Sequence, residues 1–404
     1  MCDFLNIINS LPRILSGKEL TEALKIVPEY ATEICNAPVP LRLTALSDLY
    51  RIYIPSQMSV EIYSKLYLAL LRSVQKKGTK LAIQQQNQNH RAILQQEYSG
   101  IIGGSDSFTI IGTSGIDKSS AISRAIHLMT ENRVIEVKDP YCKIVPCIVV
   151  QCPFDSSVKG LLLEVLRKVD EVLESTYYQN ALRARATTDM LIGFVSQVAL
   201  HHIGLLVVDE IQNVANSKNG KSLIGSLTQL INNSGISICM VGTPESIRFF
   251  ESAMQLARRS VGLQYTAMKY DEQFQTLCKV LFQYQYTQNR TEITNGMMEW
   301  LYEHSAGVTS VEVALIHDAQ EIAILNGTEV LNLEWLNLFL HRKMRTFPKM
   351  LFVHLLKKSS FMKTDLIGIC DLILTIRLKT LILRGEIKSP QKFPPFVHRS
   401  TGCY

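Results

Sequence analysis

The sequence of 404 residues predicts an α/β protein with a parallel-sheet core, a helical N-terminal segment, a small helical domain and a basic tail. Three observations support this. Between residues 101 and 269, short apolar runs alternate with helical patterns, as in βαβ units. Residues 270–340 keep helical spacing but lose the strand-like runs. Residues 341–404 hold 13 Lys and Arg against 3 Asp and Glu, which indicates contact with nucleic acid or another acidic partner.

The composition excludes several classes of protein. With 47% apolar and 19% charged residues, the chain can bury a core and is not generally disordered. The first residues lack the pattern of a secretory signal, and charged residues interrupt the apolar stretch 366–383, so we expect a cytoplasmic protein without a membrane span. The nine cysteines form no C-x-x-C pair, although Cys142, Cys147 and Cys152 recur every five residues. No histidine lies near these three, which argues against zinc.

The elements follow in order along the chain. Apolar residues at helical spacing predict helices from residue 17 and over 60–74, and the polar stretch 84–89 is expected to be exposed helix or linker. Strands are predicted at 107–111, 145–150, 205–208, 236–241 and 263–268, and helices at 119–130, 160–173, 191–201, 222–232, 295–304 and 310–325. The expected domains are a helical region (1–100), an α/β core (101–269), a helical domain (270–340) and a basic tail (341–404).

A phosphate-binding loop is predicted directly after the first strand. The segment GTSGIDKSS fits the pattern G-x-x-x-x-G-K-[ST] except at its second glycine. Backbone N–H groups of such a loop and the positive end of the following helix bind phosphate oxygens. Lys118 would reach the β- and γ-phosphates of ATP, and the Ser119 hydroxyl would bind Mg²⁺. The predicted cofactor-binding residues are Gly112, Thr113, Ser114, Gly115, Ile116, Asp117, Lys118, Ser119 and Ser120.

Asp117 occupies the position of the missing glycine. It adds a side chain where the backbone approaches phosphate, and a negative charge beside a polyanion. Two like charges about 4 Å apart repel by about 4 kcal/mol at an effective dielectric near 20. We therefore expect weakened ATP binding or slow turnover. The alternative interpretation of the segment is an ordinary Gly/Ser turn before a helix.

A second motif, LLVVDE over 205–210, is a predicted buried strand that ends in two carboxylates. An Asp at the carboxyl end of a parallel strand lies at the crevice where ligands bind, so Asp209 can hold the Mg²⁺ that Ser119 also contacts. Glu210 would polarise the water that attacks the γ-phosphate. The strand at 145–150 separates the two motifs along the chain, which favours the additional-strand class of ATPases.

Two further segments complete the predicted catalytic set. Thr243 follows the fourth strand and can contact the γ-phosphate or the attacking water. A predicted helix over 245–257 leads to Arg258 and Arg259. In an oligomer, this pair could reach the ATP site of a neighbouring molecule and stabilise the transition state of phosphoryl transfer there. The alternative for this pair is a surface position at a helix end, where the dipole favours cations.

Together these residues resemble the AAA+ ATPases, and more closely TnsC and TniB, the ATPase regulators of bacterial DNA transposition. The resemblance covers roughly residues 50–330. It rests on the segments Tyr53-Ile54-Pro55, GSDSFTIIGTSGIDKSS (104–120), QCPFDSSVKG (151–160), IGLLVVDEIQN (203–213) and Ala257-Arg258-Arg259.

The resemblance implies an ATP-dependent homo-oligomer on duplex DNA, a ring or a helical filament, that links target-selector proteins to the transposase. In such an assembly Lys159, Lys218 and Lys221 could face the central channel and bind DNA, or they could be solvated loop residues. The tail would contact DNA or the transposase. No Lys or Arg lies between residues 305 and 321, so the nucleotide-sensing cation that AAA+ proteins often place there is absent. Two alternatives stay open: a nucleotide-binding scaffold with little hydrolysis, and a signalling ATPase.

Overall fold

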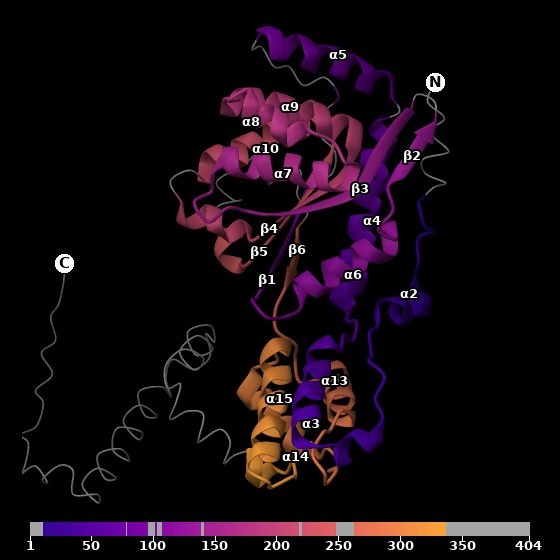
Figure 1. The fold of residues 1–404 in the computed structure, drawn as a ribbon, viewed down its shortest axis with the longest axis vertical. Helices are drawn as coiled ribbons and strands as arrows, with labels where there is room; N and C mark the ends of the chain where they lie inside the picture. The colour runs from indigo at the N-terminus through magenta and orange to yellow at the C-terminus, as the bar shows by residue number, and fades with distance from the viewer. Residues whose placement is uncertain are drawn as a thin grey trace, which may run out of the picture. The chain divides into compact units, whose positions relative to one another are not determined.

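A computed structural model describes residues 11–77, 79–95, 102, 107–138, 141–217, 220–247 and 262–336 (Figure 1). Lys218, Arg258, Arg259, most of the predicted helix over 245–257 and the basic tail lie outside these residues. Within the described ranges, no helix is both long and apolar enough to cross a membrane. The cytoplasmic location stays a prediction.

The described strands form one sheet in the order β2-β3-β4-β5-β1-β6. All neighbours pair in parallel except β2 and β3, which form an antiparallel pair. The strands are β1 (Phe108–Gly112), β2 (Ile135–Lys138), β3 (Tyr141–Gln151), β4 (Ile203–Asp209), β5 (Ser237–Gly242) and β6 (Leu263–Tyr265). The five predicted strands are therefore present. The strand β2 and the first residues of β3 were not predicted from the sequence.

The two motif strands, β1 and β4, are separated in the sheet by one strand. This strand is β5, because β1 and β4 each pair with it on opposite sides. The strand predicted at 145–150 belongs to β3, which pairs with the far side of β4. The additional-strand arrangement is thus confirmed, but the inserted strand comes after the acidic strand in the sequence, not before it.

Helices cover both faces of the sheet (Figure 1). One face packs against α2 (Gly17–Leu24), α4 (Gln57–Lys77) and α6 (Lys118–Thr130), and the other against α7 (Val158–Leu173), α9 (Thr188–His202) and α10 (Gly220–Ser234). A short helix, α8 (Tyr177–Arg183), joins the second group. Every residue of β1 and β5 is buried, as expected for parallel strands covered on both faces.

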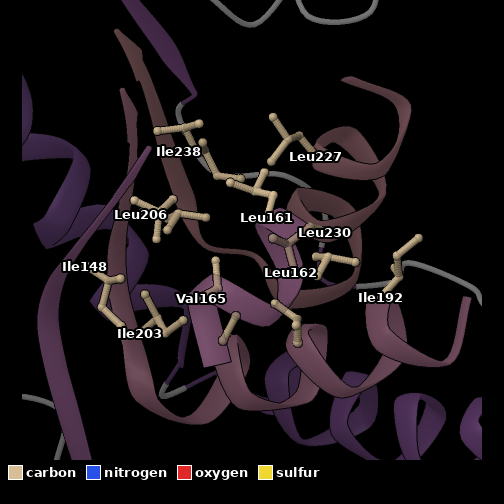
Figure 2. Close-up of a cluster of buried hydrophobic side chains, with 14 of the residues drawn as sticks. Ile148, Leu161, Leu162, Val165, Ile192, Ile203, Leu206, Leu227, Leu230 and Ile238 are labelled. Carbon is tan, nitrogen blue, oxygen red and sulfur yellow. The ribbon is translucent and has the colours of Figure 1, made fainter. Parts of the chain in front are cut away.

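Alternation along the strands supplies the two halves of the core. On β4, Leu206 faces α7 and α10, whereas Leu205 and Val207 face α4 and α6. Figure 2 shows the first of these clusters, in which strand and helix side chains interdigitate: Ile148, Leu161, Leu162, Val165, Ile192, Ile203, Leu206, Leu227, Leu230 and Ile238. The core therefore fixes the carboxyl end of β4, which carries the predicted acidic pair.

The polar stretch 84–89 belongs to α5 (Lys80–Gln95) and is not wholly exposed, contrary to the prediction. Gln85 and Asn89 are buried, and they are hydrogen-bonded to each other at 2.8 Å. Asn89 also donates to the carbonyl of Asn233 on α10, and Gln85 accepts from the N–H of Ile102. Amide side chains one helical turn apart were interpreted as solvated because composition alone does not reveal such partners.

The N-terminal region is shared between the core and the C-terminal helices. Residues 28–51, with the 3-10 helices η1 (Thr32–Asn36) and η2 (Leu46–Arg51) and the helix α3 (Val39–Ala45), pack against α15 (Thr309–Leu325) and the residues around α13 (Glu272–Gln283). The chain leaves the core at Ile26 and returns at Tyr53, and these two residues form an antiparallel bridge. The division of the chain into domains stays a prediction.

A buried ion pair joins these segments. Arg42 donates two hydrogen bonds to the carboxylate of Glu329, at 2.6 and 2.7 Å. The Arg42 guanidinium holds the pKa of Glu329 below its usual value. Removal of either partner would leave a charge uncompensated, so this pair ties residues 28–51 to the segment after α15.

Candidate nucleotide-binding site

The phosphate loop connects β1 to α6, as the sequence predicts. Gly115 in this loop has φ of 82°, a conformation that favours glycine. A Cβ at this position would lie 2.3 Å from Ser310 Oγ and 2.9 Å from Val308 Cγ1, so glycine also permits the close approach of the α15 N-terminus. The N–H of Ser310 donates to the Gly115 carbonyl at 3.0 Å. The first turn of α15 thus contacts the loop directly.

Asp117 adopts a left-handed backbone conformation, which favours glycine. It is the N-cap of α6, with φ of 65° and ψ of 27°, and its side chain makes no capping hydrogen bond. Asp is one of the few residues other than glycine that visit this left-handed region. Burial raises the pKa of its carboxyl from 3.8 to about 6. The loop therefore holds a partly buried acidic group in a left-handed backbone conformation.

We expect Asp117→Asn to stabilise the nucleotide-free chain in a pH-dependent way. The carboxyl binds its proton more tightly in the folded chain, so ionisation favours unfolding. This cost is absent well below pH 3.8, develops between pH 3.8 and about 6, and is complete above pH 6. The rise in the thermal unfolding midpoint should be full at pH 7.5, while at pH 4.5 the free-energy gain falls to about a third. Equal stabilisation at both pH values would contradict the burial of a charge.

Lys118 lies in the loop rather than in solvent. Its side chain is 9% exposed, and its Nζ donates to the carbonyls of Gly112 and Thr113, each at 2.8 Å. The ammonium is thereby held at the centre of the loop that is expected to surround phosphate. A bound phosphate would offer this ammonium stronger, charge-assisted partners than the carbonyls.

The predicted metal ligands approach each other from two elements. Ser119 stands in the first turn of α6 and Asp209 ends β4, and Ser119 Oγ lies 3.4 Å from Asp209 Oδ2. The other carboxylate oxygen, Oδ1, accepts from the N–H of Glu210 at 2.8 Å. A hydroxyl and a carboxylate are oxygen donors of the kind that Mg²⁺ prefers, so the residues fit this ion.

Gln212, which was not among the predicted site residues, connects Glu210 to Thr243. Glu210 has φ of 56°, which turns its exposed side chain away from the strand direction. Its carboxylate accepts a hydrogen bond from Gln212 Nε2. Gln212 Oε1 accepts in turn from the backbone N–H of Thr243 at 3.3 Å. The only signal in the sequence was the position of Gln212 within the VDEIQN segment.

A pocket of about 210 Å³ brings most of the predicted residues together. Its lining comes from the loop, from α6, and from the carboxyl ends of β4 and β5: Ser114, Gly115, Asp117, Lys118, Ser119, Ser120, Asp209, Glu210, Gln212, Gly242 and Thr243. Three of the predicted loop residues, Gly112, Thr113 and Ile116, do not line it. The pocket thus gathers one cation, three carboxylates and hydroxyl groups around the loop.

A second pocket, of about 170 Å³, adjoins the first at Asp117. Its lining is largely apolar and comes from the segment before α4, the first turn of α4, the loop, the end of β6 and the residues after it, α13 and α15: Ile52, Tyr53, Ile54, Ser56, Gln57, Met58, Ser59, Ile116, Asp117, Tyr265, Thr266, Met268, Gln273, Leu277 and Thr309. This pocket was not predicted, although Tyr53 and Ile54 belong to a segment that carries the family resemblance. Its position beyond the phosphate loop suits the base and sugar of a nucleotide.

The described lysines of the predicted DNA surface lie on two adjoining segments. Lys159 and Lys221 are exposed in the first turns of α7 and α10. The segments before these helices are joined by a hydrogen bond from Ser217 Oγ to the Asp155 carbonyl, at 2.9 Å. The two lysines therefore belong to one region of the surface.

Part of the chain is similar to a known protein family. Residues 102–269 match the family model of the bacterial TniB protein. No match was found among curated proteins. Among solved structures, the chain resembles the Aeropyrum pernix Orc1 protein in complex with DNA, with 14% sequence identity and a TM-score of 0.43. That similarity covers 66% of this chain and 65% of the Orc1 chain.

The family match spans four of the five segments that carry the resemblance noted in the sequence, all except Tyr53-Ile54-Pro55. The predicted resemblance to TniB is confirmed over this range. Residues 102–269, which hold the described strands of the sheet and the phosphate loop, are therefore similar to the bacterial TniB protein.

Proposed function

We propose that this chain is an ATP-hydrolysing regulator of DNA transposition that assembles on duplex DNA and couples target-site selection to recruitment of the transposase. The observation that carries the proposal is the convergence of Lys118, Ser119, Asp209, Glu210 and Thr243 around one pocket, within the segment that matches the TniB family. Each of these side chains has the chemistry that one part of phosphoryl transfer requires.

For binding, we place the phosphates of ATP against the loop and its base in the adjoining apolar pocket. Lys118 would exchange its carbonyl partners for the β- and γ-phosphate oxygens. The backbone N–H groups at the start of α6 would add partial positive charge. Asp117 lines both pockets and opposes the phosphate charge, which supports weak binding or a requirement for the metal ion.

For hydrolysis, we assign Glu210 as the residue that accepts a proton from the attacking water. Thr243 stands at the end of the strand between β4 and β1, where its hydroxyl can contact that water or the γ-phosphate. Ser119 and Asp209 would hold Mg²⁺, which when bound neutralises charge on the phosphate oxygens. Arg258 and Arg259, outside the described residues, stay the predicted contribution of a neighbouring subunit.

For DNA, we assign the region of Lys159, Lys218 and Lys221, together with the basic tail. Exposed lysines that contact phosphates bind duplexes with little sequence preference, and each contact releases counterions. This part of the proposal rests on charge and on the family resemblance.

A nucleotide-binding scaffold with little hydrolysis is the second candidate. The observation that favours it is the partly buried carboxyl of Asp117 inside the phosphate loop. In that case ATP would stabilise the assembly, and Glu210 would contribute little.

The proposed assembly is tested by sedimentation of the full chain with duplex DNA, with and without a slowly hydrolysed ATP analogue. We expect DNA-bound oligomers only with the analogue. Replacing Lys159 or Lys221 with Gln should lower the slope of log affinity against log salt by about 0.9 for each lysine that binds a phosphate. Lys279→Gln, an exposed lysine on α13, is the matched control and should leave the slope unchanged. If the slopes for Lys159→Gln and Lys221→Gln are as unchanged as that of the control, these lysines do not bind DNA phosphates and the proposed DNA surface is wrong.

A further inference from the structure

Gln212 occupies a bridging position between two elements of the candidate site. It lies in the 3-10 helix η3 (Ile211–Asn216), directly after the acidic pair that ends β4. Its side chain contacts Glu210 on its own segment and Thr243 at the end of the neighbouring strand β5. No role for this residue follows from the phosphate-loop or acidic-strand motifs.

The two hydrogen bonds use opposite ends of the side-chain amide. The NH₂ group donates to Glu210 Oε2, and the carbonyl oxygen accepts from the Thr243 N–H. A carboxylate can only accept and a backbone N–H can only donate, so the reverse orientation of the amide would lose both bonds. This arrangement requires a side chain with a donor and an acceptor at this length, which is glutamine.

The neighbouring strand leaves space for this amide. A Cβ added at Gly242 would lie 2.9 Å from Gln212 Oε1 and 2.7 Å from Ile211 Cγ2. Glycine at the end of β5 therefore lets η3 approach the strand closely enough for the bond to Thr243. The left-handed backbone at Glu210 turns the chain from β4 into η3 and brings the two side chains together.

We propose that Gln212 is a positioning residue that links the γ-phosphate contact at Thr243 to the orientation of Glu210. This inference rests on the proposed function. With one oxygen of Glu210 held by Gln212, the other can accept the proton of the attacking water. The water oxygen then bonds to the γ-phosphorus, the bond from phosphorus to the bridging oxygen breaks, and ADP leaves with that electron pair. A shift of the backbone at Thr243 would move the amide, and with it the carboxylate.

The prediction is a loss of kcat with nucleotide affinity retained. Gln212 lines the pocket, but both ends of its amide are hydrogen-bonded to Glu210 and Thr243. Gln212→Ala removes these two bonds, so the Kd for a slowly hydrolysed analogue should stay within about twofold. Misplacement of the base by about 1 Å should lower kcat by about 10- to 100-fold. Retained binding of the analogue also shows that the variant is folded.

Two further variants separate orientation from size. Gln212→Glu keeps the length and the acceptor for Thr243, but it places a second carboxylate against Glu210, so kcat should fall at least as far as in Gln212→Ala. The control is Asn213→Ala, because Asn213 points to the Cys152 carbonyl at 2.9 Å instead. This variant should keep kcat within about threefold of the wild type.

The outcomes distinguish this inference from the proposed function. If the wild type hydrolyses ATP and either Gln212→Ala or Gln212→Glu keeps the wild-type kcat, the positioning role of Gln212 is wrong, and the proposed function stands. A tenfold or larger rise in Kd in Gln212→Ala overturns this role too, because the residue would then act on binding. Wild type that binds ATP without turnover overturns the hydrolytic function, and this inference with it.

Discussion

Replacing Lys118 with alanine is expected to weaken ATP binding by at least about 100-fold and to abolish nucleotide-dependent assembly. The ammonium lies inside the phosphate loop and is the only cation lining the pocket among the described residues. Loss of two charge-assisted hydrogen bonds to phosphate corresponds to about 3 kcal/mol, or roughly two orders of magnitude in Kd. Calorimetric titration with a slowly hydrolysed analogue measures the effect directly.

Lys279→Ala on α13 is the matched control, since this lysine is exposed and does not line the pocket. Thermal unfolding of both variants shows whether removal of the hydrogen bonds to Gly112 and Thr113 also affects the fold. Unchanged ATP affinity in Lys118→Ala would remove the assignment of the phosphate loop and the function built on it.

Replacing Glu210 with Gln is expected to lower ATP turnover by about 1,000-fold while ATP and Mg²⁺ still bind. The amide has the same shape but cannot accept the proton of the attacking water, and a general base contributes about 10²- to 10⁴-fold. Ser119 and Asp209, the predicted metal ligands, are unchanged. Single-turnover release of phosphate, measured beside analogue binding, separates chemistry from affinity.

Glu303→Gln, an exposed carboxylate on α14, controls for the loss of a surface charge and should turn over ATP like the wild type. If Glu210→Gln hydrolyses ATP at the wild-type rate, another group acts as the base. The carboxyl end of β4 would then contribute only to Mg²⁺ binding, through Asp209.

Local patterns predicted most of the α/β core, because each element of a parallel sheet carries its own signal. Four apolar residues before Asp209 specify a strand buried on both faces, and the loop pattern around Lys118 specifies a strand-to-helix turn. The same reasoning placed Ser119, Asp209, Glu210 and Thr243 correctly near one pocket, since parallel strands expose their carboxyl ends at one edge.

Features that depend on distant pairing were not predictable in this way. Arg42 and Glu329 are 287 positions apart, and nothing local indicates that the segment 28–51 packs on the C-terminal helices. The order of strands in the sheet is likewise a long-range property, and the sequence does not indicate that β5 lies between the two motif strands. Gln212 is a polar residue in a short helix, and only its two partners reveal its position.

The sequence predicted that the Asp117 carboxylate opposes bound phosphate, but it did not predict the environment of this residue. The sequence indicates a carboxylate beside phosphate, whereas the structure adds that the residue keeps the left-handed backbone of a glycine and is buried enough to raise its pKa to about 6. The unfavourable charge that this carboxylate places beside phosphate is the feature that favours a scaffold with little hydrolysis.

Release of phosphate from Mg·ATP by the full wild-type chain, measured with and without duplex DNA, tests the central claim most directly. The claim is that Lys118, Ser119, Asp209, Glu210 and Thr243 form one hydrolytic site. It predicts steady phosphate release that DNA increases and that Glu210→Gln abolishes without loss of bound ATP. Wild type that binds ATP and assembles on DNA but releases no phosphate would contradict it and would establish the scaffold instead.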